Sequence, residues 1–161
     1  MNWTGVMPAL TTAFDANLKV DHEFVGRHAR WQVENGVSGI IALGSLGEAA
    51  TLTFDEKVAV VDTLVRAVNG KVPVVAAISA LSTEECVKIA RAAHAHGASG
   101  LMILPPYVYQ GDWSEMKAHV GAVLEATPLT AMLYNNLVAY GTDFNPEQIQ
   151  ELAADYSNLV A

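Results

Sequence analysis

Short apolar runs recur along this chain at intervals of about thirty residues, the length of a βα unit. They begin at Val6, Gly39, Pro73, Gly100 and Thr130, and amphipathic stretches lie between them. Each run is continuously apolar, as is typical of parallel strands covered on both faces. We therefore predict five βα units, after which the segment "NLVA", residues 158–161, begins a sixth strand.

The amphipathic stretches carry signals for where each helix begins and ends. Three starts have the capping-box pattern, in the pairs Thr53–Glu56, Ser82–Glu85 and Asp112–Glu115. Further signals are the expected N-caps Asp21 and Asn145, with Pro146 after the latter, and the glycines at positions 36, 70 and 97 that follow the first three helices. Such alternation fits an open doubly wound sheet or a (β/α)8 barrel, and the pattern alone does not separate the two.

Composition argues against several classes of protein. The chain has 161 residues, of which 52% are apolar, so it has enough material for a sizeable core. Its formal net charge of −8 disfavours nucleic acid or an anionic membrane as a partner. No apolar run reaches the roughly 18 residues of a membrane helix. The single cysteine, Cys86, has no partner for an internal disulfide and is predicted to be a buried spectator. We expect a cytoplasmic protein that binds neither nucleic acid nor a membrane.

The end of the second predicted strand has an unusual sequence, "GSLGE", at residues 44–48. The two glycines are expected to let the backbone turn tightly, which would bring the amides and the Ser45 hydroxyl close to a small anion. An ordinary βα turn, in which Glu48 bonds neighbouring backbone, is the alternative. The segment matches neither the dinucleotide-binding fingerprint nor a P-loop, so a nucleotide site is not predicted.

Tyrosines follow two later strands. Tyr107 and Tyr109 lie in the loop "LPPYVYQGDW", where they are expected to cover a pocket or a subunit contact, and Tyr134 lies at the end of the fifth strand. A phenol at a strand end can pass protons in a dry pocket, although packing is the commoner role. No set of histidine, cysteine and carboxylate residues has metal-ligand spacing, so no metal site is predicted.

Taken together, these strand ends resemble the dihydrodipicolinate synthase / N-acetylneuraminate lyase family of class I, Schiff-base-forming (β/α)8 barrels. The family's strand-two signature, Gly-Ser/Thr-Thr-Gly-Glu, stands here as "GSLGE", and its strand-five signature, Tyr-Asn-x-Pro followed by glycine, stands as "YNNLVAYG". The opening "GVMPALTTAFD" and the "PPY" after strand four are also similar. The resemblance implies an α/β fold, a (β/α)8 TIM barrel of which residues 1–161 cover about five βα units and the start of strand six.

The resemblance also implies roles for individual residues. Ser45, with the adjacent amides at Gly44 and Leu46, would bind the carboxylate of a pyruvate-like 2-oxo acid, and Tyr107 and Tyr109 would help to hold the substrate. Tyr134 would be the general acid and base at the imine carbon. The family needs no cofactor or metal, and its members commonly form homotetramers.

The family's nucleophile is a lysine on strand six, and by resemblance it would lie two positions beyond Ala161. The five lysines of the chain are expected in a loop, on helices or before a strand, and none at the carboxyl end of a strand: Lys19, Lys57, Lys71, Lys88 and Lys117. We therefore expect residues 1–161 to be the N-terminal portion of a single barrel domain that continues through the Schiff-base lysine. This portion alone is expected to be inactive.

Departures from the family pattern bear on the substrate. Leu46 stands where the synthase has a relay threonine, Val108 stands at its second relay tyrosine, and Ala139 replaces an arginine that meets a dicarboxylic substrate; Leu137 replaces the usual proline. These changes favour a dehydratase, deaminase or aldolase acting on a 2-keto-3-deoxy sugar acid or a hydroxy-pyrroline carboxylate. Dihydrodipicolinate synthase or sialic acid lyase proper is the alternative. Two readings of other classes remain open, a non-catalytic half-barrel that serves in binding or assembly and an unrelated flavodoxin-like binding domain.

Overall fold

A computed structural model of the chain describes every residue except 107. Four parallel strands form one sheet in the order β1-β2-β3-β4, which is also their order in the sequence. Their bounds are β1 Ile40–Ala42, β2 Val74–Ile78, β3 Gly100–Ile103 and β4 Ala131–Leu133. Apart from the last two residues of β4, every strand residue is buried, as the continuous apolar runs predicted.

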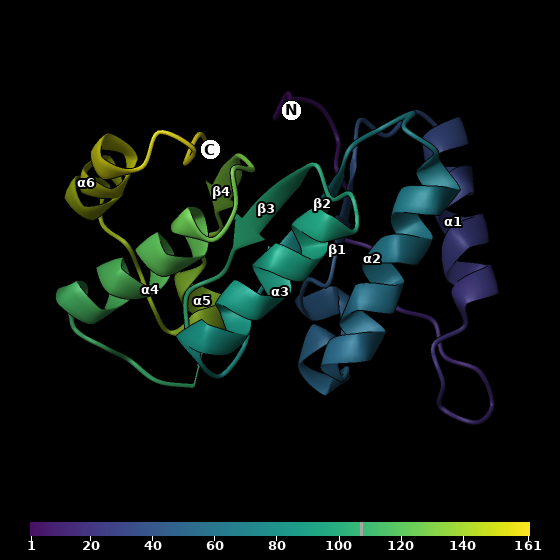
Figure 1. The fold of residues 1–161 in the computed structure, drawn as a ribbon, viewed down its shortest axis with the longest axis horizontal. Coiled ribbons are helices and arrows are strands. Elements are labelled where there is room, and N and C mark those ends of the chain that lie inside the picture. The colour runs from purple at the N-terminus through teal and green to yellow at the C-terminus, as the bar shows by residue number, and fades with distance from the viewer. Residues whose placement is uncertain (107) are drawn as a thin grey trace.

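Helices connect the strands and cover one side of the sheet (Figure 1). The long helices are α1 His22–Glu34, α2 Phe54–Val68, α3 Thr83–Ala95, α4 Trp113–Glu125 and α6 Pro146–Asp155. Three short elements are the 3-10 turns η1 Ser45–Gly47 and η2 Ala49–Thr51 and the one-turn helix α5 Leu137–Tyr140. Among the described residues, no helix has the length and apolarity needed to cross a membrane.

The sheet continues at both edges through single parallel bridges. Ala9 pairs with Ile41 on the β1 side, and Leu159 pairs with Ala131 on the β4 side. The first and sixth predicted strands are therefore present, each reduced to one bridge with its flanking backbone hydrogen bonds. The prediction of five βα units and the start of a sixth strand is confirmed.

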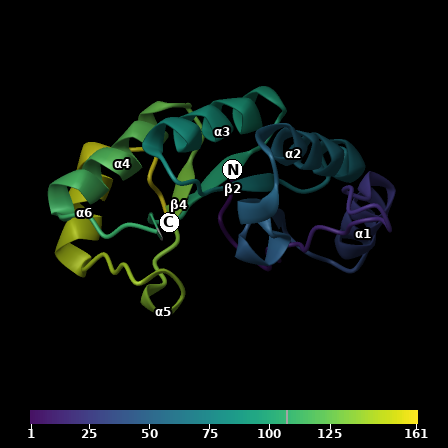
Figure 2. The ribbon, with the colours of Figure 1, turned by 90° about the horizontal axis from the view of Figure 1, so that it is seen from below.

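The placement of the helices separates the two architectures that the sequence pattern allowed. A doubly wound sheet carries helices on both faces, whereas a (β/α)8 barrel carries them all on the outside. In Figure 2 the long helices form a curved outer layer and the strands lie on its concave side, while the one-turn helix α5 and the short 3-10 turns before α2 lie on the inner side. The fold is therefore an open portion of a (β/α) barrel.

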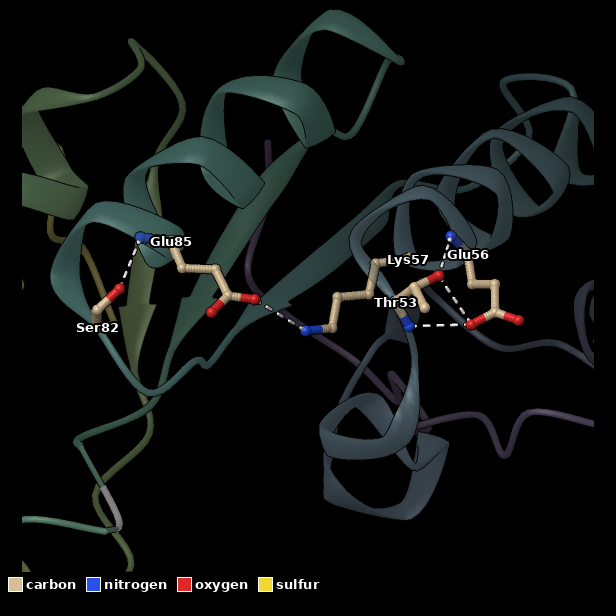
Figure 3. A network of polar contacts seen from close by, with 5 residues as sticks. All are labelled: Thr53, Glu56, Lys57, Ser82 and Glu85. Atoms are coloured by element: carbon tan, nitrogen blue, oxygen red, sulfur yellow. Dashed lines mark hydrogen bonds and ion pairs between the residues drawn. The ribbon is translucent and has the colours of Figure 1, made fainter.

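The predicted helix caps are present, with one instructive difference. Capping boxes close the starts of α2 (Thr53 with Glu56) and α4 (Asp112 with Glu115). At the start of α3, Ser82 accepts a hydrogen bond from the Glu85 amide, but the Glu85 carboxylate does not return to the Ser82 amide. It points instead toward Lys57 on α2, with 3.7 Å between Lys57 Nζ and Glu85 Oε1 (Figure 3).

The Lys57–Glu85 ion pair joins two neighbouring helices of the outer layer. The Lys57 side chain is only 7% exposed, whereas that of Glu85 is 41% exposed. The desolvation of the Lys57 ammonium is thus partly offset by the Glu85 carboxylate, which itself reaches water.

Cys86, the residue after Glu85, is buried as predicted. Burial raises the pKa of its thiol to about 11, so the thiol stays protonated.

Because Lys57 is buried and Glu85 is partly exposed, removing the charge of one or the other should change stability in different ways. Glu85→Gln leaves an ammonium buried without its counter-charge and should lower the free energy of unfolding by about 1–2 kcal/mol. Lys57→Met keeps the length of the side chain and removes the buried charge, so it should be neutral or stabilising. In the Lys57→Met background, Glu85→Gln should cost little. Urea denaturation of the four proteins measures all three differences, and a Lys57→Met variant less stable than Glu85→Gln contradicts the prediction.

Candidate functional site

The loop after β1 turns through left-handed residues that are not glycines. Leu43 has φ 62° and Glu48 has φ 54°, whereas Gly44 has an extended backbone with φ −69°. The expectation that both glycines supply the turn through their conformational freedom is therefore wrong for Gly44. Two non-glycine residues in this sparsely populated region so close together mark a locally strained segment.

Gly47 is required for space rather than for its backbone angles. A Cβ built on Gly47 would lie 2.9 Å from the carbonyl oxygen of Leu10 in the first strand. The Gly47 carbonyl also accepts a hydrogen bond from buried Thr12, at 2.7 Å from Oγ1. The loop is thus seated on the first strand at Gly47. This contact sets the position of Ser45 two residues earlier.

The short helix α5 brings a second set of polar side chains to the same region. Asn136 caps α5 by accepting from the Ala139 amide, and Gly141, with φ 68°, ends it. Tyr140, the last residue of α5, places its phenol oxygen 2.7 Å from Ser45 Oγ. Tyr134, directly after β4, packs edge-on against Tyr140 with 6.1 Å between ring centroids. Asn136 Nδ2 donates to the Tyr134 phenol oxygen at 3.2 Å, which leaves the Tyr134 proton available to another acceptor.

These groups border a cavity at the carboxyl ends of the strands. Its volume is about 160 Å³, and it is lined by residues from the ends of β1, β2 and β3 and from α5: Leu43, Ser45, Ala49, Ala50, Ser79, Leu104, Ala139 and Tyr140. The polar groups are three hydroxyls, those of Ser45, Ser79 and Tyr140. None of the lining side chains is charged. Such a cavity suits a small molecule held by hydroxyl donors on one side and apolar contacts on the other.

The structure brings only some of the predicted site residues together. Ser45 lines the cavity and Tyr134 adjoins it through Tyr140, whereas Gly44 is not among the lining residues. Leu46 is 68% exposed and is not among the lining residues. Tyr109 lies at a different cavity, and Tyr107 lies outside the described residues.

The cavity beside Tyr109 lies between the first turns of α3 and α4 and has a volume of about 240 Å³. A hydrogen bond with Glu115 raises the pKa of Tyr109, which keeps this phenol protonated. His119 lies at the same cavity with its Nδ1 atom 2.9 Å from Thr83 Oγ1, and burial lowers the pKa of its imidazole. Tyr109 is exposed at the surface, at a cavity that Ser45 does not line.

Tyr140 and Ser79 are the site residues that the sequence alone did not indicate. Ser79 follows β2 directly, and nothing in its neighbourhood sets it apart from other serines. For Tyr140 a signal was present, because Asn136 and Gly141 are an N-cap and a C-terminal glycine around a single turn. A one-turn helix after β4 folds the chain back over the strand ends and carries the tyrosine to Ser45.

The fold and the site together define a class of protein. Parallel strands in sequential order, an outer layer of helices and a polar cavity at the carboxyl ends of the strands are the features of a portion of a (β/α) barrel, the fold whose enzymes hold their active sites at this end. A family model described as the dihydrodipicolinate synthetase family matches residues 2–161. The chain belongs to this family, as the strand-end motifs indicated.

The relatives of this chain are named for different activities. The chain is 38% identical over 156 residues to a probable 5-dehydro-4-deoxyglucarate dehydratase of Pseudarthrobacter chlorophenolicus, covering 97% of this chain and 50% of that protein. It is 34% identical over 157 residues to the 4-hydroxy-tetrahydrodipicolinate synthase of Methanocaldococcus jannaschii, covering 98% and 54%. The chain thus spans about half the length of the curated relatives it matches.

Solved structures show the same similarity in space. A dihydrodipicolinate synthase superposes with a TM-score of 0.94 at 34% identity, over 98% of this chain and 54% of that one. The prophage protein YagE of Escherichia coli K12, a member of the family solved in complex with pyruvate, superposes with a TM-score of 0.94 at 26% identity, over 98% and 53%. The barrel fold that the sequence predicted is confirmed.

Proposed function

We propose that the protein carrying this chain is a Schiff-base-forming lyase that acts on a pyruvate-like 2-oxo acid. The observation that carries the proposal is the hydrogen bond between the Ser45 hydroxyl and the Tyr140 phenol at the carboxyl ends of the strands, with Tyr134 packed against the Tyr140 ring. Relatives in this family are named as a dehydratase and as synthases, and one solved relative holds pyruvate. Each residue then has a task in the reaction.

Ser45 is the anchor for the carboxylate of the 2-oxo acid. A carboxylate only accepts hydrogen bonds, and a hydroxyl on a turn that also exposes backbone amides is a suitable set of donors. None of the side chains that line the cavity is charged, so hydroxyl groups are the side-chain donors that it offers to the carboxylate.

Tyr134 is the general acid and base at the carbon that becomes an imine. The reaction needs a proton on the departing carbonyl oxygen when the amine condenses, and it needs the reverse transfer on hydrolysis. Asn136 donates to the Tyr134 oxygen, so the phenol offers its own proton to the reacting group and can take it back.

The nucleophile is a lysine contributed by residues outside this chain. All five lysines of the chain are described, and none lines the cavity that contains Ser45. Lys57, the most buried, points between α2 and α3 on the outer layer (Figure 3). The complete barrel supplies the amine, which is reactive as a free base when burial lowers its pKa.

Two substitutions favour a dehydratase, deaminase or aldolase over the synthase. Ala139 lines the cavity where the synthase pattern has an arginine, so this wall offers no cation to a second carboxylate. Leu46 has no hydroxyl to enter a relay. We propose 2-keto-3-deoxy sugar acids and hydroxy-pyrroline carboxylate as the substrate classes, and the dehydratase name of one relative agrees with this choice. The synthase is the second candidate, because several relatives carry that name.

Borohydride reduction of the full-length protein in the presence of pyruvate tests the proposal. We expect the intact mass to increase by one reduced pyruvate per chain, with the adduct mapping to a lysine outside residues 1–161. Turnover of the two proposed substrate classes, measured beside condensation of pyruvate with aspartate semialdehyde, then identifies the branch. A folded protein that binds pyruvate without an adduct would instead be a non-catalytic binding module, and one that does neither would remove the proposal altogether.

A further inference from the structure

Tyr140 makes a contact that no motif in the sequence assigns. Its phenol oxygen lies 2.7 Å from Ser45 Oγ although the two residues are 95 positions apart, and both side chains line the same cavity. The tyrosine ring is held edge-on against Tyr134, with 6.1 Å between centroids. The contact is therefore built by the fold, through the turn of α5, and the ring has a fixed orientation.

The chemistry of the pair gives the hydrogen bond a direction when a carboxylate is bound. Either hydroxyl can donate to the other, and when Tyr140 donates, Ser45 keeps its own proton for the ligand. A phenol, with a pKa of about 10, is a stronger acid than an aliphatic alcohol and is the better donor of the two. Tyr140 then donates to Ser45, and Ser45 donates to the carboxylate, which can only accept. A hydroxyl that accepts one hydrogen bond also donates a stronger one.

We propose that Tyr140 is a positioning residue for the 2-oxo acid, whose phenol holds the Ser45 hydroxyl in the orientation that donates to the substrate carboxylate. The inference rests on the proposed function. It assigns Tyr140 to substrate affinity, whereas Tyr134, which has a separate partner in Asn136, serves the chemical step. Loss of the Tyr140 hydroxyl should therefore raise KM more than it lowers kcat.

A double-mutant cycle in the full-length protein tests this assignment. Tyr140→Phe keeps the ring and its packing on Tyr134, and it should raise KM for the 2-oxo acid roughly tenfold while kcat falls less than about threefold. Ser45→Ala should raise KM by at least as much. The double variant should be no worse than Ser45→Ala alone, because Tyr140 acts through Ser45. As a matched control, Tyr156→Phe removes a phenol that packs against Gly121 on α4, outside the cavity, and should leave KM unchanged.

The outcomes separate this inference from the proposed function. If the wild-type protein forms the pyruvate adduct but Tyr140→Phe has the wild-type KM, the role of Tyr140 is overturned and the lyase stands. If the effects of Tyr140→Phe and Ser45→Ala add in the double variant, the phenol acts independently of Ser45 and the inference is again wrong. If the wild-type protein neither binds pyruvate nor forms an adduct, both proposals fall together.

Discussion

Replacing Tyr134 by phenylalanine in the full-length protein should lower kcat by about 10²- to 10³-fold, the range expected for loss of a general acid and base. The ring and its edge-on contact with Tyr140 are kept, so the cavity retains its shape. The substitution removes the phenol proton. Asn136 leaves this proton available in the wild-type protein, because it donates to the Tyr134 oxygen. Steady-state turnover and the rate of borohydride-trapped adduct formation measure the effect on the whole cycle and on imine formation separately.

Two further tyrosine substitutions test whether the loss of kcat is specific to Tyr134. Tyr156→Phe should retain wild-type kcat, because its phenol lies against α4 and not at the cavity. Tyr140→Phe should act mainly on KM, so the two neighbouring phenols should separate into a chemical and a binding role. A Tyr134→Phe enzyme with more than half of the wild-type kcat would show that the proton passes through another group, and Ser79 at the same cavity would be the next hydroxyl to test.

The parts of the fold that the sequence predicted are those governed by local rules. Continuous apolar runs located the strands, and caps such as Thr53 and Asp112 located the helices, because a capping side chain acts within its own first turn. The barrel itself followed from a resemblance of motifs rather than from periodicity. Its physical signature, long helices on one side of the sheet only, is a property of the connections in space (Figure 2).

What the sequence did not predict depends on contacts between distant segments. Glu85 looked like a capping-box residue, yet its carboxylate turns to Lys57 on another helix, where it offsets a buried charge. Tyr140 reaches Ser45 across 95 residues through a helix of four residues, which is too short for a periodic pattern. The strand-end motif was recognised for its residues but explained by the wrong mechanism, since Leu43 and Glu48 adopt the left-handed angles and Gly47 answers a steric demand.

That steric demand leads to a prediction in which stability and activity change together. Gly47→Ala would place a methyl carbon 2.9 Å from the Leu10 carbonyl oxygen, a backbone atom that cannot turn aside as a side chain would. The loop must move away from the first strand, which also strains the bond from Thr12 to the Gly47 carbonyl. We expect a loss of about 1–3 kcal/mol in the free energy of unfolding, as for other overpacked buried sites.

The same shift should reach the chemistry, because η1 carries Ser45 and Gly47 within one turn. A displacement of about 1 Å at a positioning group can cost on the order of a hundredfold in rate, so kcat/KM should fall at least about tenfold. Gly44→Ala is the matched control, since a Cβ there would meet the Ala9 Cβ at 3.7 Å and the Met102 Cε at 4.0 Å, which are ordinary contacts. Gly47→Ala should therefore unfold at a lower urea concentration than Gly44→Ala, and it should also have the lower kcat/KM. Equal effects at both positions would mean that the loop needs glycine for its motion rather than for its fit against the first strand.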